Sequence, residues 1–209
     1  MRDIFTSEDI LTQELSVRLK SNQIVEENSS DFDLTPNVFS KKIKFQPAAV
    51  LLPIVFDKSG PSVVFTRRAK HLKHHAGQIA FPGGKVEESD RSEIDTAIRE
   101  CFEEIYLEST DINILGILPR HNTITGYSIR PFVAIIKNFE KLKPGLMEVS
   151  CIFKIPLKFL LTKKNMRLHC IRFNGHQRTY YSIPYGPFYI WGATARIVKT
   201  FSEVIIRQI

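Results

Sequence analysis

The sequence lacks the features of a membrane-spanning or disulfide-stabilised protein. Its longest apolar stretch, residues 48–56, is interrupted by Pro53 and is far shorter than a membrane-spanning helix. The first residues lack the basic-then-apolar order of a secretion signal. The three cysteines, Cys101, Cys151 and Cys170, are too widely spaced for a metal-binding pattern. We therefore expect a cytoplasmic protein whose reduced cysteines are small core residues.

The sequence also lacks a run in which basic and aromatic residues alternate, as nucleic-acid-binding motifs often do. The net charge is nevertheless +7, with 29 lysines and arginines against 22 acids. This excess suits nucleic acid, an acidic membrane surface or a polyanionic small molecule, and it also suits a solvated basic surface. We expect a small-molecule substrate and neither a nucleic-acid nor a membrane partner. A homodimer is compatible with the sequence.

Apolar periodicity divides the 209 residues into an N-terminal extension and one globular domain. Residues 1–45 contain a predicted amphipathic helix at 6–21 and a polar linker, and residues 46–209 form the domain. Its strands are predicted at 48–56, 62–67, 112–118, 129–137, 151–155, 167–173 and 178–184, and its helices at 91–106 and 193–207. This order predicts the α/β or α+β class, with a mixed central sheet covered by helices.

The predicted helix 91–106 concentrates acidic side chains. Glu100, Glu103 and Glu104 stand at i, i+3 and i+4 and therefore lie on one flank. The predicted core-facing stripe comprises Ile94, Ala97, Ile98, Cys101, Phe102 and Ile105. Grouped carboxylates repel one another unless a cation lies nearby, and Mg²⁺ and Mn²⁺ prefer such oxygen ligands. The alternative is a solvated acidic face.

Two neighbouring features favour the metal-site interpretation. Arg99 can reach Glu103 at i+4 and hold its carboxylate in place. Upstream, Gly83-Gly84 forms a turn whose backbone is accessible because no Cβ obstructs it. Asp90 and Glu93 have capping-box spacing for the start of the helix. The sequence therefore predicts a cradle for metal and phosphate.

Gly84, Asp90 and the run Arg99-Glu100-Cys101-Phe102-Glu103-Glu104 resemble the Nudix box. Asp90 in place of glutamate, with one extra residue before Arg99, resembles the coenzyme A pyrophosphatase branch of that family. The segment 64–84 is similar to the one that marks this branch, and the likeness covers about residues 47–198. Tyr106 departs from the pattern because a glycine with positive φ usually ends this helix. We therefore expect the helix to run further or to end differently.

The resemblance implies a Nudix α/β/α sandwich that hydrolyses the pyrophosphate of coenzyme A or its thioesters. The products would be 3′,5′-ADP and 4′-phosphopantetheine, and Mg²⁺ or Mn²⁺ would be required. The implied metal ligands are the Gly83 carbonyl and the carboxylates of Glu100, Glu103 and Glu104. The base would be Glu100 or Glu148, with Arg99 as an orienting partner, and the candidate substrate-binding residues are Arg68, Lys73, His75 and Gly84. Turnover of another nucleoside diphosphate derivative, and a Nudix-like binding module without turnover, remain the alternatives.

Overall fold

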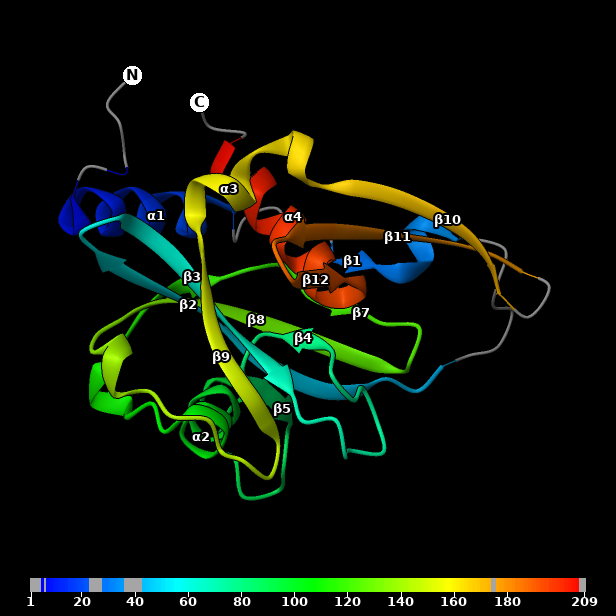
Figure 1. Cartoon of the computed structure of the whole chain (residues 1–209), viewed down its shortest axis with the longest axis horizontal. Coiled ribbons are helices and arrows are strands. Elements are labelled where there is room, and N and C mark those ends of the chain that lie inside the picture. The colour runs from blue at the N-terminus through cyan, green and yellow to red at the C-terminus, as the bar shows by residue number, and fades with distance from the viewer. Residues whose placement is uncertain (1–4, 6, 23–27, 36–42, 174–175, 207–209) are drawn as a thin grey trace.

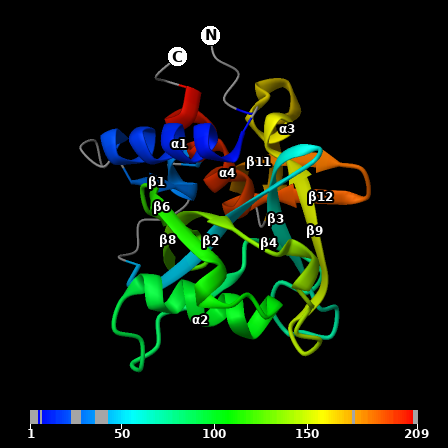
Figure 2. The ribbon, with the colours of Figure 1, turned by 90° about the vertical axis from the view of Figure 1, so that its left-hand side faces the viewer.

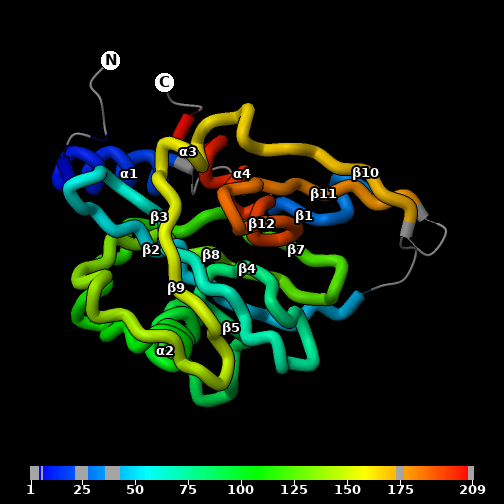
Figure 3. Tube along the Cα trace, viewed as in Figure 1, coloured from blue at the N-terminus to red at the C-terminus, as the bar shows by residue number. Residues whose placement is uncertain are grey.

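A computed structural model describes residues 5, 7–22, 28–35, 43–173 and 176–206, and its main feature is a nine-stranded mixed sheet (Figure 1). The strand order is β1-β7-β8-β2-β3-β4, with β5 paired to β2, β6 to β8 and β9 to β3. The strands are β1 (Ser29–Ser30), β2 (Gln46–Asp57), β3 (Gly60–Arg68), β4 (Ile79–Ala80), β5 (Gly83–Lys85), β6 (Ile112–Ile117), β7 (His121–Asn122), β8 (Tyr127–Ile136) and β9 (Val149–Pro156). Strands β2 and β8 pair in parallel, whereas β3 pairs antiparallel with both β2 and β9. The course of the chain through these strands can be followed in Figure 3.

Helices cover both faces of this sheet (Figure 2). They are α1 (Glu8–Asn22), α2 (Glu93–Ile105), α3 (Leu157–Leu161) and α4 (Gly192–Ile206), with short 3₁₀ helices at Asp31–Leu34, Ser109–Asp111, Phe139–Lys141 and Lys163–Asn165. Consecutive residues of a strand face opposite sides of the sheet. Leu51 and Leu52 of β2 are therefore both fully buried, because helices cover both faces. Leu51 packs in the core beneath α2, and Leu52 packs in the core shared by α1, α3 and α4. The predicted mixed sheet between helical layers is confirmed.

The N-terminal helix α1 packs against the central sheet. Leu11, Leu15 and Leu19 are fully buried and belong to the core that contains Leu52. A Cβ added to Gly116 of β6 would lie 2.7 Å from Leu19 Cβ, so the absent side chain allows the helix to approach the strand closely. The division of the chain at residues 45 and 46 stays a prediction.

A second, three-stranded antiparallel sheet lies beside α4 (Figure 1). It consists of β10 (Arg167–Phe173), β11 (His176–Tyr185) and β12 (Phe188–Trp191). Strands at 167–173 and 178–184 were predicted, whereas β12 and the short strands β1, β4, β5 and β7 were not. The dipeptide Asn174-Gly175 between the two predicted strands is a hairpin signal in the sequence, and it lies outside the described residues.

The cysteine prediction is right for one residue and wrong for another. Cys101 is buried, Cys151 is half-buried and Cys170 is exposed, and all three are free thiols. Cys170 is exposed because it lies on β10, the edge strand of the second sheet. None of the described helices is long and apolar enough to cross a membrane.

Candidate active site

Helix α2 begins at a serine cap, not at the predicted capping box. Ser92 Oγ accepts a hydrogen bond from the Asp95 amide at 3.4 Å. The Asp90 carboxylate has a different set of partners and does not cap the helix. It accepts bonds from the Glu87 amide at 2.9 Å and from Thr96 Oγ1 at 2.8 Å. The Asp90–Glu93 capping prediction is therefore wrong.

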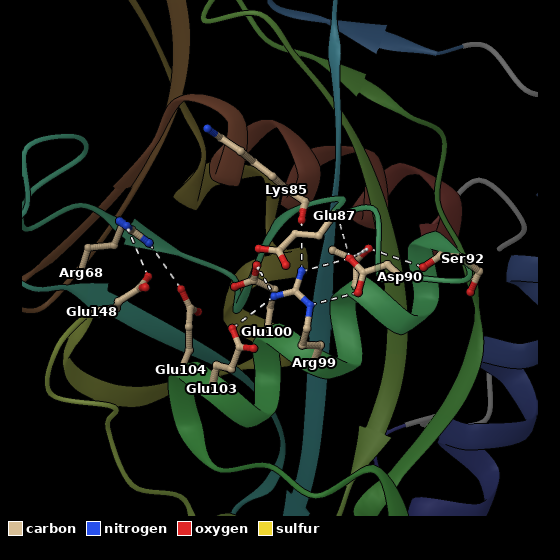
Figure 4. A network of polar contacts seen from close by, with 11 residues as sticks. Arg68, Lys85, Glu87, Asp90, Ser92, Arg99, Glu100, Glu103, Glu104 and Glu148 are labelled. Atoms are coloured by element: carbon tan, nitrogen blue, oxygen red, sulfur yellow. Dashed lines mark hydrogen bonds and ion pairs between the residues drawn. The ribbon is translucent and has the colours of Figure 1, made fainter.

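Arg99, in the middle of α2, is the centre of a polar network that reaches back to the residues before the helix (Figure 4). Its Nε and Nη2 each donate to Asp90 at 3.0 Å, and this two-pronged bond fixes the guanidinium. Its Nη1 donates to Glu100 at 3.0 Å and to Glu103 at 3.2 Å, as the i+4 spacing predicted for the latter. Its Nη2 also donates to the Lys85 carbonyl of β5 at 3.2 Å. Arg99 thus orients two carboxylates of the box and ties the helix to β5.

The sequence did not reveal the partnership of Asp90 with Arg99. The Asp90 side chain is only 4% exposed, and the bonds from Arg99 hold the pKa of its carboxyl far below the usual range. The two residues are nine positions apart, and this spacing does not predict a contact between side chains of one helix. A loop has to fold back before the two side chains can meet.

Arg68 lies between two other carboxylates. Its Nη1 donates to Glu104 at 3.4 Å, and its Nη2 is 3.8 Å from Glu148 (Figure 4). Arg68 ends β3, whereas Glu148 precedes β9, the neighbouring strand. The Ala69 amide donates to the Glu148 carbonyl at 2.7 Å, so the backbone also joins the two segments. The structure therefore brings the predicted Glu148 to the acidic helix.

The three box glutamates differ in their exposure to water. The side chain of Glu103 is 55% exposed, that of Glu100 is 14% exposed and that of Glu104 is 3% exposed. Burial raises the pKa of Glu100 above its usual value, although Arg99 opposes the shift. Burial, together with the charges of Glu100 and Glu148, raises the pKa of Glu104 to about 8, although Arg68 opposes it. A cation near Glu104 would therefore be strongly stabilising.

A buried oxygen of Glu104 supports a cation site at this position. Glu104 Oε2 is buried and has no hydrogen-bond partner among the described residues, which is costly for a carboxylate. However, no three His, Cys, Asp or Glu side chains in the described ranges are already grouped to hold a metal. Instead, Arg68 and Arg99 neutralise the carboxylates of Glu100, Glu103 and Glu104 (Figure 4). The donor set fits Mg²⁺ or Mn²⁺, provided that these side chains rotate away from the arginines.

Gly83 and Gly84, predicted as a turn, instead lie in the short strand β5 and fit closely against the helix and the sheet. A Cβ on Gly84 would lie 2.2 Å from Glu100 Oε1, so only glycine leaves room for that carboxylate. Gly83 has φ 149°, and a Cβ there would lie 2.3 Å from the Ala49 carbonyl oxygen. The pairing of β5 with β2 fixes both glycines beside the acidic helix.

Tyr106 ends α2 in the left-handed conformation, with φ 53° and ψ 36°. Its amide donates to the Phe102 carbonyl at 2.9 Å, as in the αL termination motif, and the Leu107 amide donates to the Cys101 carbonyl at 3.3 Å. The expectation that the helix runs further or ends differently is therefore wrong. Tyrosine adopts the conformation that glycine usually supplies, at some cost in free energy.

The predicted apolar stripe of α2 needs one correction. Ala97, Cys101 and Ile105 are fully buried against the sheet, whereas Phe102 is 46% exposed. The Phe102 ring instead contacts the Tyr106 ring edge-on, at 6.1 Å between centroids. Phe102 lies at the edge of the apolar stripe, where the helix surface turns towards solvent.

Lys73 and His75 lie in the exposed loop between β3 and β4. His75 has φ 56°, and its Nδ1 is 2.8 Å from Gln78 Oε1. The loop contacts the segment before β9, since His71 Nε2 lies 3.0 Å from the Met147 carbonyl oxygen. The substrate-binding roles of Arg68, Lys73 and His75 stay predictions, and Arg68 is already engaged by two carboxylates.

Known proteins resemble this chain in both sequence and fold. Residues 45–148 match the family model of the NUDIX domain. The chain is 34% identical over 166 residues to the uncharacterized Nudix hydrolase NudL of Escherichia coli K12, an alignment that covers 79% of this chain and 86% of that protein. The solved NUDIX hydrolase from Alicyclobacillus acidocaldarius is similar in fold, with a TM-score of 0.50 and 18% identity over 78% of this chain and 93% of that one. The MutT/nudix family protein from Enterococcus faecalis also has a TM-score of 0.50, with 15% identity over 96% of this chain and 75% of that one.

Proposed function

This chain belongs to the Nudix hydrolase family, and on that premise we propose that it hydrolyses the pyrophosphate bond of coenzyme A or a coenzyme A thioester. One water is consumed and one phosphorus–oxygen bond of the diphosphate breaks. The products are 3′,5′-ADP and 4′-phosphopantetheine, or its acyl derivative. We also propose Mg²⁺ or Mn²⁺ as the cofactor and the cytoplasm as the location.

The buried, partnerless oxygen of Glu104 is the observation that carries the proposal of metal-dependent chemistry. Glu100 and Glu103, with the Gly83 carbonyl, would complete the ligand set on the same side of β5. A bound divalent ion would neutralise charge on the diphosphate oxygens and lower the pKa of the attacking water. The choice of coenzyme A is supported by the likeness of residues 64–84 to that branch of the family, and Arg68 of this segment lies at the acidic cluster.

The side chains of this site can position the substrate and accept the proton from water. Glu100 is our first candidate for the base because Arg99 and Gly84 fix its carboxylate and burial raises its pKa. Glu148 is the second candidate because its side chain is 55% exposed and therefore accessible to water. Arg68 would donate to a phosphate oxygen once a cation takes its place beside Glu104.

The test is release of 3′,5′-ADP from coenzyme A by the purified chain in the presence of Mg²⁺ or Mn²⁺. Glu103→Gln should greatly reduce turnover because it removes a charged ligand without changing the shape of the side chain. Glu108→Gln is the matched control, since Glu108 is an exposed glutamate just beyond α2 with no side-chain cap bond. Equal turnover by Glu103→Gln and the wild type would contradict the proposed metal site.

A substrate panel distinguishes coenzyme A from other nucleoside diphosphate derivatives. The proposed enzyme should prefer coenzyme A to dephospho-coenzyme A, dinucleotides and nucleotide sugars, because only coenzyme A carries both the 3′-phosphate and the pantetheine. Preference for another member of the panel would retain the Nudix chemistry and replace the substrate. Tight ligand binding without metal-dependent product would identify a binding module.

A further inference from the structure

The C-terminal part of the chain carries a concentration of positive charge that the catalytic site does not use. Residues 149–202 contain no aspartate or glutamate and nine lysines and arginines. The rest of the chain therefore has 20 basic residues against 22 acids and a net charge of −2, so the excess of the protein lies in this segment. The segment builds β9, the second sheet and most of α4.

Most of these basic side chains have no acidic partner. Three of them pair with acids: Lys154 with Asp57, Arg196 with Asp33 and Lys199 with Glu203. Six form no ion pair with any described residue, and these are Lys158, Lys163, Lys164, Arg167, Arg172 and Arg178. Unpaired positive charge of this density attracts polyanions.

One face of the second sheet is covered by α4. Tyr181 of β11 lies under two basic side chains of that helix, with Arg196 at 5.7 Å and Lys199 at 5.3 Å from its ring centroid. Ile183 and Ile190 on the same face are fully buried. Because side chains alternate along a strand, the residues between these project from the opposite face.

The opposite face combines arginines with aromatic rings. The strand register places Arg167 across from Ser182, His169 across from Tyr180, and Ser182 across from Trp191. This face, called the aromatic–basic face below, comprises Arg167, His169, Ile171, Arg178, Tyr180, Tyr189 and Trp191. Tyr189 is 44% exposed and Ile171 is 42% exposed, so this face is open to solvent in part.

The rings of the aromatic–basic face hold one another in place. His169 stacks on Tyr180 at 5.4 Å between centroids, and Trp191 meets Tyr180 edge-on at 5.7 Å. His169 Nε2 also lies 2.8 Å from the hydroxyl of the buried Ser182, which fixes the imidazole. Asp31 interacts electrostatically with Arg178 without forming an ion pair with it. The Asp31 carboxylate lies instead 3.2 Å from His121 Nε2. The face therefore offers ordered rings with cations beside them.

We propose that the aromatic–basic face binds single-stranded nucleic acid, with phosphates on Arg167 and Arg178 and an unpaired base on Tyr189. Single strands are held by this combination of stacking rings and cations, because every base has an apolar face and every linkage a negative charge. A base-paired duplex keeps its bases stacked inside and would not use the rings. The expectation of no nucleic-acid partner came from the lack of an alternating run, whereas here the alternation is built across three strands.

Charge and geometry argue against two other occupants. A second copy of the chain would bring two positive faces together, which disfavours a symmetric dimer through this face. A membrane would need apolar side chains that insert together. Leu168 and Ile171 are both exposed, but they stand three residues apart on β10 and so project from opposite faces. Single-stranded nucleic acid satisfies both the charge and the rings.

The test is fluorescence anisotropy of labelled single-stranded RNA and DNA oligonucleotides of about 12 nucleotides, within the length that one such surface contacts. The full chain is titrated in EDTA across a salt series. Replacing Arg167 and Arg178 by glutamine should make the slope of log affinity against log salt shallower by about 0.7 for each arginine that contacts a phosphate. Tyr189→Ala should weaken binding roughly tenfold through lost stacking.

Matched controls lie elsewhere on the surface. Lys58→Gln removes one positive charge from the exposed turn between β2 and β3, and Tyr106→Ala removes a ring of similar exposure, 52%. Both should bind as the wild type does, and so should Glu103→Gln, since the proposed face lies outside the catalytic site. Urea unfolding of each variant verifies that the fold is retained.

Several outcomes would overturn the proposal. These are no binding at about 50 mM salt, equal losses in the control variants, loss of binding in Glu103→Gln, and a preference for duplex. Binding to vesicles that contain phosphatidylserine tests whether the face is instead a membrane-binding surface. If they bind as tightly as the oligonucleotides, and Tyr189→Ala weakens neither, the face is a membrane surface and the proposal fails. Equal binding of RNA and DNA supports the proposal. A preference for one of the two single strands supports it and also identifies the type of nucleic acid.

Discussion

Glu104→Gln is expected to make the metal-free protein more stable, increasingly so as the pH rises. The Glu104 carboxylate is 3% exposed and has one oxygen without a partner. Its charged form is therefore poorly solvated in the folded protein and well solvated in the unfolded chain. Glutamine keeps the size and one acceptor oxygen but removes the charge.

The pKa of Glu104 sets the magnitude of this effect. The pKa of Glu104 is about 8 in the folded protein, against an ordinary value of 4.5 for a glutamate. Because the folded state binds this proton more tightly than the unfolded state, stability falls as the pH rises from 4.5 to 8 and is then constant. At 1.36 kcal/mol for each pH unit, the loss has a ceiling of about 5 kcal/mol. The free energy of unfolding of Glu104→Gln should therefore match the wild type near pH 4 and exceed it above pH 8 by at most that amount.

Urea unfolding in EDTA at several pH values measures the difference, with the fluorescence of Trp191, the single tryptophan, as the signal. Glu103→Gln is the control because Glu103 is 55% exposed and its charge is solvated in both states. Mg²⁺ should then stabilise the wild type at pH 8 and stabilise Glu104→Gln much less, because the ion binds the folded site. Parallel pH curves for the wild type and Glu104→Gln in EDTA would refute the reasoning from burial.

Three further substitutions test other parts of the site. Gly84→Ala should lower kcat about 100-fold or more while the fold is retained, because its Cβ would lie 2.2 Å from Glu100 Oε1 and displace that carboxylate; unchanged kcat would contradict this. Asp90→Asn should lower the free energy of unfolding at neutral pH by about 2 kcal/mol through the weakened bonds to Arg99. The difference should shrink in acid, because a carboxyl with a lowered pKa contributes stability that is lost as the pH falls, and a constant difference would argue against the ion pair. Tyr106→Gly should stabilise the protein by up to about 1 kcal/mol in urea unfolding by relieving the left-handed conformation, with kcat unchanged, whereas a destabilised variant would show that the ring contributes more than the strain costs.

Local sequence patterns predicted the acidic helix correctly, because all the residues in the pattern belong to one helix. The i, i+3 and i+4 spacing placed Glu100, Glu103 and Glu104 on one flank, and the same geometry brought Arg99 to Glu103. The predicted turn at Gly83-Gly84 is wrong, because both glycines lie in the short strand β5 and pair with β2. The expectation that the missing Cβ atoms leave room there is confirmed, since a Cβ on Gly84 would lie 2.2 Å from Glu100 Oε1. The long strands and helices followed from periodicity, which is also a local property.

Features that depend on how the helices and strands pack could not be predicted from local sequence patterns. Periodicity counted Phe102 among the core residues, but its side chain is 46% exposed and contacts the Tyr106 ring instead of the sheet. Because a glycine usually follows the Nudix box, the tyrosine at position 106 suggested that the helix ends in a different way. Tyr106 instead adopts the left-handed conformation, and the chain on either side of it is held by α2 and by the buried Leu107. The short strands were not predicted, because two or three residues are too few to show the alternation of apolar and polar side chains that marks a strand.

The sequence alone determined the family, the layered fold and the acidic helix, because these depend on residues close together in the chain. Tertiary structure alone decided which charges meet: Asp90 with Arg99, Arg68 with Glu104 and Glu148, and the arginines with the rings of the second sheet. These contacts join segments that are separated along the chain. Their distances, burial and pKa shifts exist only after the backbone has folded, since a charge acts on what lies beside it in space.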